Sequence, residues 1–177
     1  IERADDRGAI VICAAGNEGR GTISWPAAGP RTVSQGAIDH KQRKLADFSS
    51  TNQAVNFVGP GVRILSTYKG GGYATLSGTS MAAPWLAGLA ALLVSGEIAH
   101  TGKPQTFSGR DFVKNVALAC DDLGRAGRDD AYGFGLPIPR RLLAAPADKP
   151  QQPQPTRTLS WADLLKILLE LLLKNVK

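Results

Sequence analysis

The segment LSGTSMAAPWLAGLA, residues 76–90, constrains the fold more than any other part of the chain. It joins an extended, hydroxyl-rich run, residues 73–77, through Gly78 to a small and apolar run that reaches Val94. Glycine lets the backbone turn sharply, so Ser80 is expected where a strand gives way to a helix. A helix that is apolar around its whole circumference should be buried. We therefore predict a buried helix from Ser80 to Val94.

The position of Ser80 at a helix start permits two interpretations. A helix N-terminus offers unpaired N–H groups and the positive end of the helix dipole. A hydroxyl there can attack a carbonyl carbon while nearby donors hold the oxygen that becomes negative. The same position also suits a serine that only caps the helix. The spacing of the residues alone does not decide whether Ser80 is a nucleophile or only a helix cap.

A second candidate residue, Asn17, follows an apolar run upstream. Residues 9–15 form a short, continuous run with β-branched members, which is typical of a strand covered on both faces in a parallel sheet. The run ends in the turn Gly16-Asn-Glu-Gly19. Ligands of open α/β sheets bind beyond the carboxyl ends of strands, and Asn17 stands at such an end. A turn asparagine with left-handed geometry is the alternative.

Several sequence blocks, in this order, resemble the C-terminal half of the subtilisin-like serine proteases over about residues 1–145. The blocks are AAGNEG (14–19), WPAAGPRTVSQGAID (25–39), NFVGPGVRILST (56–67), GTSMA followed by proline (78–84) and YGFGL (132–136). The resemblance implies an α/β fold with a three-layer parallel sheet flanked by helices. It also implies a serine endopeptidase that hydrolyses peptide bonds in polypeptide substrates through an acyl-enzyme.

The resemblance assigns roles to individual residues. Ser80 corresponds to the nucleophile, and Asn17 to the asparagine whose side-chain amide binds the oxyanion. The remaining expected substrate-binding residues are Ala14, Ala15, Gly16, Ser24 and Thr79. Of these, the first three would form one wall of the pocket for the residue before the scissile bond, and Ser24 at its base would leave that pocket roomy.

The catalytic triad of the family is not complete in this sequence. Such a serine needs a base and an orienting carboxylate, and the family order is aspartate, histidine, serine. His40 lies in the polar run DHKQRK, and His100 follows the nucleophile; neither fits the family's histidine block. The chain also starts at Ile1 rather than methionine. We therefore expect the aspartate and histidine in a missing N-terminal half, and expect this chain alone to be inactive and marginally folded.

Two other functions compete with this interpretation. A degenerate protease-like module could act in protein binding through its C-terminal helix, although intact Asn17 and Ser80 argue against such decay. An α/β-hydrolase esterase fails, because its acid and histidine follow the serine and a second elbow glycine is lacking. One residue departs from the family pattern: Trp85 stands where a histidine commonly follows Pro84. That histidine is not the catalytic base of the family. The bulkier tryptophan beneath Ser80 nevertheless affects where Ser80 is placed.

The composition changes after residue 145. Residues 146–158 contain four prolines and are expected to form an extended, semi-rigid linker. Residues 159–177 are rich in leucine, with a narrow polar stripe, and are expected to form an amphipathic helix. Such a helix must cover its apolar face on the protease body, a partner protein or a membrane surface. Docking on protein is favoured because the stripe carries both signs of charge.

Charge and cysteine content exclude some partners. The net charge is +6, from 21 basic and 15 acidic residues, but the basic residues are scattered, so no nucleic-acid partner is expected. Calcium binds many relatives near the loop that follows Ser24, yet no acidic cluster supports a metal or other cofactor here. Cys13 and Cys120 suit buried thiols, with a disulfide left open. The resemblance favours a secreted or periplasmic location.

Overall fold

The structure is a computed structural model that describes residues 1–101 and 108–143, with side chains undescribed for residues 97–101. The described residues fall within one compact unit, Ile1–Ala144. The predicted linker, residues 146–158, and the predicted leucine-rich helix, residues 159–177, lie outside the described residues.

The central sheet is built on three parallel strands. β2 (Val33–Asp39) lies between β1 (Ile12–Ala14) and β4 (Val55–Pro60), and both neighbours run parallel to it. A short fourth strand, β3 (Lys44–Leu45), returns antiparallel to the end of β2. The first predicted strand, residues 9–15, is thus present in a shorter form. Its residues are half-buried rather than buried, because β1 lies at the edge of the described sheet.

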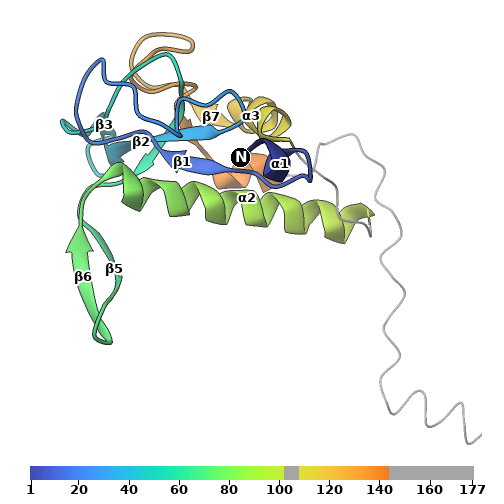
Figure 1. Cartoon of the computed structure of the whole chain (residues 1–177), viewed down its shortest axis with the longest axis horizontal. Helices are drawn as coiled ribbons and strands as arrows, with labels where there is room; N and C mark the ends of the chain where they lie inside the picture. The colour runs from blue at the N-terminus through green and yellow to red at the C-terminus, as the bar shows by residue number, and fades with distance from the viewer. Residues whose placement is uncertain (102–107, 144–177) are drawn as a thin grey trace, which may run out of the picture. The chain divides into compact units, whose positions relative to one another are not determined.

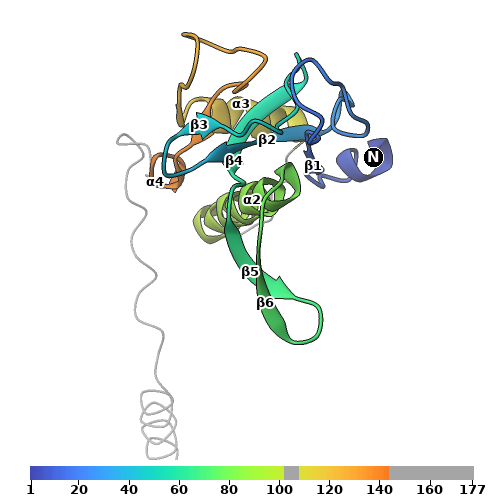
Figure 2. The same ribbon diagram turned by 90° about the vertical axis from the view of Figure 1, so that its left-hand side faces the viewer.

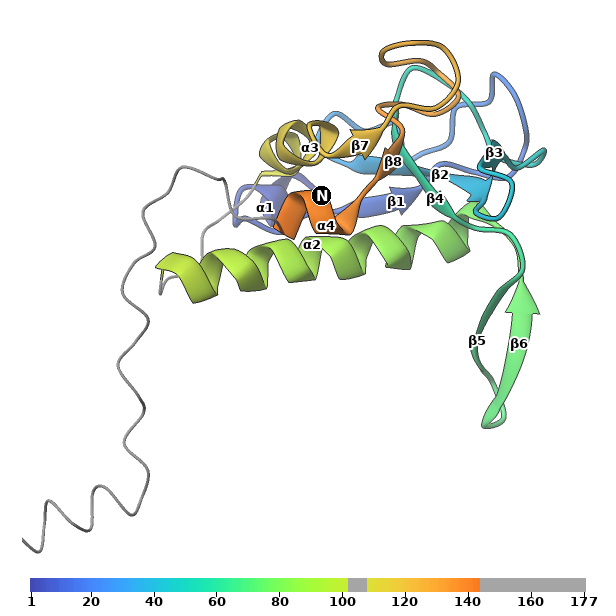
Figure 3. The same ribbon diagram turned by 180° about the vertical axis from the view of Figure 1, so that it is seen from behind.

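Helices cover both faces of this sheet. α2 (Thr79–Thr101) runs along one face and α3 (Gly109–Ala117) lies on the other (Figures 1 and 3). Six of the seven residues of β2 are buried, as expected of a strand enclosed between two helical layers. The main core cluster consists of Val33, Phe57, Leu86, Leu89, Ala90, Phe112 and Val116. The described part is therefore a helix–sheet–helix arrangement.

α2 differs from its prediction in length and burial. It begins at Thr79 and continues to Thr101, beyond the predicted end at Val94. The helix is also not buried all round: Leu92 is 52% exposed. Within the described residues the sheet and α4 (Pro139–Leu143) make the most extensive contacts with it. An apolar outer face therefore remains open on α2.

The next two strands do not join the parallel sheet. β5 (Ile64–Tyr68) and β6 (Gly72–Leu76) pair with each other as an antiparallel hairpin. The hairpin projects from the rest of the described chain (Figure 2) and leads into α2. Leu65 is 67% exposed and Tyr73 is 74% exposed. Two strands alone have little independent stability, and this hairpin buries few of its apolar side chains within the described part.

The closing turn YGFGL is fixed by backbone contacts that only glycine permits. A Cβ on Gly133 would lie 2.2 Å from the carbonyl oxygen of Asn56, and one on Gly135 would lie 2.1 Å from that of Asp121. Both glycines also have positive φ. The turn joins β7 (Cys120–Asp121) to its antiparallel partner β8 (Leu136–Pro137), and so anchors the end of the described chain beside β4.

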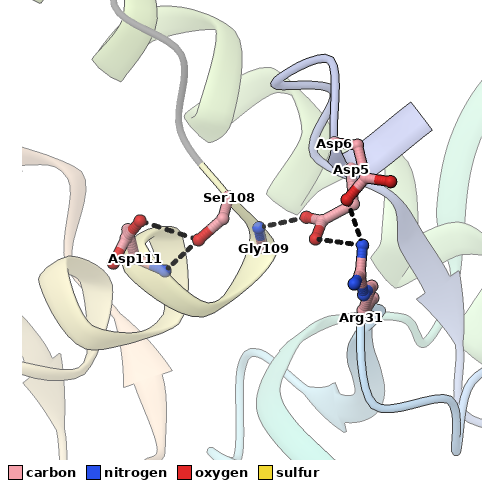
Figure 4. A network of polar contacts seen from close by, with 6 residues as sticks. All are labelled: Asp5, Asp6, Arg31, Ser108, Gly109 and Asp111. Atoms are coloured by element: carbon pink, nitrogen blue, oxygen red, sulfur yellow. Dashed lines mark hydrogen bonds and ion pairs between the residues drawn. The ribbon is translucent and has the colours of Figure 1, made fainter. Parts of the chain in front are cut away.

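One polar network ties the start of the chain to α3 (Figure 4). Asp5, at the end of α1 (Glu2–Asp5), accepts a hydrogen bond of 2.7 Å from the backbone N–H of Gly109 and lies 3.9 Å from Arg31. Ser108 caps α3 by accepting from the backbone N–H of Asp111 at 3.1 Å. Two N–H groups of α3 are thus satisfied by side chains.

We predict that Asp5→Ala lowers the free energy of unfolding by about 1–2 kcal/mol, because the first turn of α3 loses a charged acceptor. The Asp5 side chain is only 11% exposed, so water replaces it poorly. Urea unfolding measures the change. Asp47→Ala is the control, since Asp47 is exposed and has no side-chain partner among residues 1–101 and 108–143; equal losses in both variants would contradict the prediction.

Candidate active site

The turn that carries Asn17 continues directly from β1. Ala15 is buried, and its backbone N–H donates to the carbonyl oxygen of Gln35 at 2.9 Å, which extends the β1–β2 pairing by one residue. Gly16 then turns with φ +114°, and a Cβ at this position would lie 2.6 Å from Oγ of Ser24. Only glycine fits there. Asn17 is thus placed just beyond the carboxyl end of β1, as predicted from sequence.

Ser80 approaches the same end of the sheet from the hairpin. After β6, the backbone N–H of Gly78 donates to the carbonyl oxygen of Gly61 at 2.8 Å, and the N–H of Met81 donates back to Gly78 at 3.0 Å. These bonds fix the first turn of α2, whose start lies at the carboxyl end of β1 (Figures 1 and 3). Ser80 is exposed in this turn.

Thr79 joins the two segments. Its backbone N–H donates to Oδ1 of Asn17 at 2.9 Å, and its hydroxyl lies 3.0 Å from the same oxygen, across a separation of 62 residues. The hydroxyl also accepts from the backbone N–H of Gly16 at 3.3 Å. Thr79 is fully buried, so its side chain holds the two segments together rather than reaching a substrate. The structure therefore brings Asn17 beside Ser80.

These bonds also orient the amide of Asn17. A backbone N–H can only donate, so the Asn17 atom that faces Thr79 must be the oxygen. The Nδ2 group then points elsewhere, and no described residue accepts a hydrogen bond from it; it lies 3.5 Å from the Cβ position of Gly78. Because Asn17 is exposed, its amide can donate to a ligand placed beside Ser80.

A carboxylate that sequence reasoning did not assign lies beside Gly16. Oε2 of Glu18 accepts from the hydroxyl of Ser50 at 3.0 Å and from that of Ser24 at 3.3 Å. A Cβ on Gly16 would lie 2.4 Å from this oxygen. Ser24, an expected substrate-binding residue, is therefore close to Gly16. Ala14, another of these expected residues, is the last residue of β1. The available signal was the glutamate in AAGNEG; nothing in the sequence pointed to Ser50.

The hydrogen bonds of Glu18 have an electrostatic consequence. The hydroxyl of Ser50, more than any other group, lowers the pKa of the Glu18 carboxyl, against a smaller opposing effect of desolvation. Ser24 and the backbone N–H groups of Asn17 and Glu18 lower this pKa further. Hydrogen bonds to the charged form favour that form. Glu18, the residue directly after Asn17, therefore stays negatively charged to a lower pH than an ordinary glutamate.

Among the side chains that the structure describes, none that could activate Ser80 is found beside it. His40 is exposed in the turn after β2, and His100 lies near the end of α2 with its side chain undescribed. The Ser80 hydroxyl makes no hydrogen bond to another described residue. Burial raises the pKa of the Cys13 thiol, and that of Cys120 to about 12, so these free cysteines are poor nucleophiles.

Metal ligands are not grouped in the described part of the chain. Within residues 1–101 and 108–143, no three or more histidine, cysteine, aspartate or glutamate side chains are arranged to hold an ion. What this site can supply is a hydroxyl at a helix start, an oriented amide and a fixed carboxylate. That set suits attack on a polarised carbonyl group.

Comparison of the chain with known proteins identifies one matching family. The profile of the subtilase family matches residues 1–135. The chain is 39% identical over 137 residues to the minor extracellular protease Epr of Bacillus subtilis (strain 168). The aligned segment covers 77% of this chain and 20% of that relative. It is 37% identical over 139 residues to subtilisin Savinase of Lederbergia lenta. The aligned segment covers 77% of this chain and 46% of that relative.

A solved structure agrees in fold. The prenylagaramide maturation protease PagA superposes with a TM-score of 0.70 at 27% identity, over 80% of this chain and 52% of that one. The chain thus spans about half, or less, of the length of these relatives. Further relatives include both extracellular and intracellular proteases. The match of the family profile to most of the described residues establishes that the chain belongs to the subtilase family of serine proteases.

Proposed function

We propose that the chain carries the nucleophile and the oxyanion donor of a subtilisin-like serine endopeptidase. Ser80 attacks the carbonyl carbon of a peptide bond. The side-chain amide of Asn17 and the backbone N–H of Ser80 stabilise the oxyanion, an acyl-enzyme forms, and water releases it. One observation carries the proposal: Thr79 bonds to Oδ1 of Asn17 with both its N–H and its hydroxyl, which turns the amide donors outward next to Ser80.

The proposal requires a base and a carboxylate from outside this chain. The relatives are about twice as long as the matched segment or longer, and two surfaces of the described part suit a further layer. They are the free edge of β1 and the apolar outer face of α2, where Leu92 is 52% exposed. We infer that an upstream segment with the aspartate and histidine covers these surfaces and completes the parallel sheet.

We also propose that residues 1–145 form the C-terminal part of a peptidase domain with three layers. The linker (146–158) and the protein-docking amphipathic helix (159–177) expected from the sequence lie outside the described residues. The substrate is a polypeptide. Relatives act inside and outside cells, and a secreted or periplasmic location is proposed from the family resemblance alone.

Glu18 indicates a preference among polypeptide substrates. Its carboxylate is held ionised by Ser50 and Ser24 beside Gly16, at the wall proposed to contact the residue before the scissile bond. A fixed negative charge attracts a cationic side chain, although solvent screens an exposed pair. We infer that lysine or arginine is preferred over a neutral residue of similar length at this substrate position.

The nucleophile is tested by labelling the full-length protein with a fluorophosphonate. We expect Ser80 to be labelled and Ser80→Ala to abolish both labelling and peptide hydrolysis. Asn17→Ala should reduce kcat by about 10²–10³-fold, a magnitude taken from a subtilisin. Ser66→Ala, an exposed serine on the hairpin, is the control.

The same assay separates the enzyme from a binding module. Absence of labelling at Ser80 in the full-length protein would contradict the proposed peptidase and favour the binding module. The 177-residue chain expressed alone should show no turnover, since it lacks the base. Turnover by this chain alone that Ser80→Ala abolishes would contradict the inference that the base lies upstream.

The substrate preference is tested with Glu18→Gln. We expect kcat/KM for a peptide with lysine before the scissile bond to fall about 2- to 5-fold, the range of an exposed charge pair. A matched peptide with norleucine there should be unaffected. Glu2→Gln, which removes an exposed charge on α1, is the control. An equal change for both peptides would rule out recognition by charge.

The electrostatic role of Ser50 is tested by NMR titration of the Glu18 carboxyl. We expect Ser50→Ala to raise the pKa of Glu18 toward its ordinary value of 4.5, because the largest of the lowering interactions is removed. Ser24→Ala should raise it less. Since the folded-state pKa is lowered, the stabilisation from ionised Glu18 is complete above the unfolded value and is lost as pH falls through the folded value. Equal pKa values in both variants and the parent would refute this assignment.

A further inference from the structure

Trp85, the residue that departs from the family pattern, occupies a gap above β4. An ideal Cβ on Gly59 would lie 3.0 Å from Cε3 of Trp85 and 2.4 Å from Nε2 of Gln35. The indole ring from α2 and the carboxamide from β2 therefore fill the space that any side chain at position 59 would need. The bulky Trp85 fits against the sheet because Gly59 has no side chain, and Gln35 occupies the same space.

Gln35 is an unexpected residue at this place. It is fully buried on β2 between Val33 and Ala37, which belong to the apolar clusters that also contain Leu86 and Ala82 of α2. Neither Oε1 nor Nε2 has a hydrogen-bond partner among the described residues. A buried amide without partners is rare and costs stability. An apolar residue of similar size would avoid that cost, so stability alone does not explain the glutamine.

The position of Gln35 connects both halves of the proposed site. Its backbone carbonyl accepts the hydrogen bond from Ala15 that leads into the turn of Asn17. Its Nε2 atom and Cε3 of Trp85 both border the point where a Cβ on Gly59 would stand, at 2.4 Å and 3.0 Å. Trp85 is on the same helix as Ser80 and little more than one turn after it. Gln35 thus connects to the turn of Asn17 through its backbone and shares the space at Gly59 with the helix of Ser80.

We propose that Gln35 is a positioning residue of the active site, whose carboxamide fills the space at Gly59 together with Trp85 and so sets where α2, and with it Ser80, lies relative to Asn17. This inference rests on the proposed function. It requires that loss of the carboxamide displaces the first turn of α2 without loosening the core. Small displacements of a reacting group have large effects on rate.

The test is Gln35→Leu in the full-length protein. We expect the rate of fluorophosphonate labelling at Ser80 and the kcat for a peptide to fall about 10- to 100-fold, with KM unchanged. The midpoint of thermal unfolding should stay the same or rise, because a buried unpaired amide is removed. A residue with a structural role alone would lower both stability and activity, or neither. Gln53→Leu, at an exposed glutamine, is the matched control.

A second pair of variants tests whether Gln35 acts through Trp85. In a Trp85→Phe background, Gln35→Leu should cause little further loss, since the filling of the space at Gly59 is already altered. An undiminished loss in that background, or an unchanged labelling rate in the Gln35→Leu single variant, would overturn the inference.

Hydrogen exchange separates this inference from the proposed function. The backbone N–H of Thr79 is bonded to Asn17, and its exchange rate reports the contact between the two segments without any chemistry. We expect Gln35→Leu to speed exchange at Thr79, even if Ser80 of the parent protein is never labelled and the proposed function fails. Unchanged exchange at Thr79 would overturn the positioning role, whatever the labelling result.

Discussion

The arrangement of the candidate site depends on the bonds between Thr79 and Asn17. Hydrogen bonds from the Thr79 N–H and hydroxyl converge on a single oxygen of Asn17. They fix the direction of the amide, and they place the first turn of α2 against the end of β1. Because Thr79 is fully buried, its N–H and hydroxyl would be left without this partner if Asn17 were absent. Without these bonds, the two exposed residues of the site, Asn17 and Ser80, would have no reason to lie together.

The sequence predicted the strands and turns that depend on local chemistry. The strand within residues 9–15 and the start of α2 near Ser80 both appear where they were expected. Asn17 could be placed at the end of a strand because a short apolar run leads into the turn that carries it, whereas a role for Ser24 was only implied by the family resemblance. Where a short motif determines its own backbone, the sequence was a sufficient guide.

Predictions failed where distant segments decide the outcome. The resemblance implied a parallel sheet, but residues 64–76 form a separate antiparallel hairpin, and no other described strand pairs with them. The apolar pattern of α2 predicted complete burial, yet packing partners reach only part of it. Ser50 approaches Glu18 across 32 residues, and no periodicity or motif announces such a contact. The packing of Trp85 and Gln35 around Gly59 likewise required coordinates.

The wide sequence separation within the site has a kinetic consequence. Asn17 and Thr79 are 62 residues apart, and β1 pairs with β2 in parallel, across a long connection. Contacts of this kind form late, because the entropy of closing a long loop opposes them until the intervening structure exists. During synthesis, the amide of Asn17 emerges before the helix that orients it. If the proposed function holds, a polypeptide still leaving the ribosome has no assembled site with which to cleave itself or its neighbours.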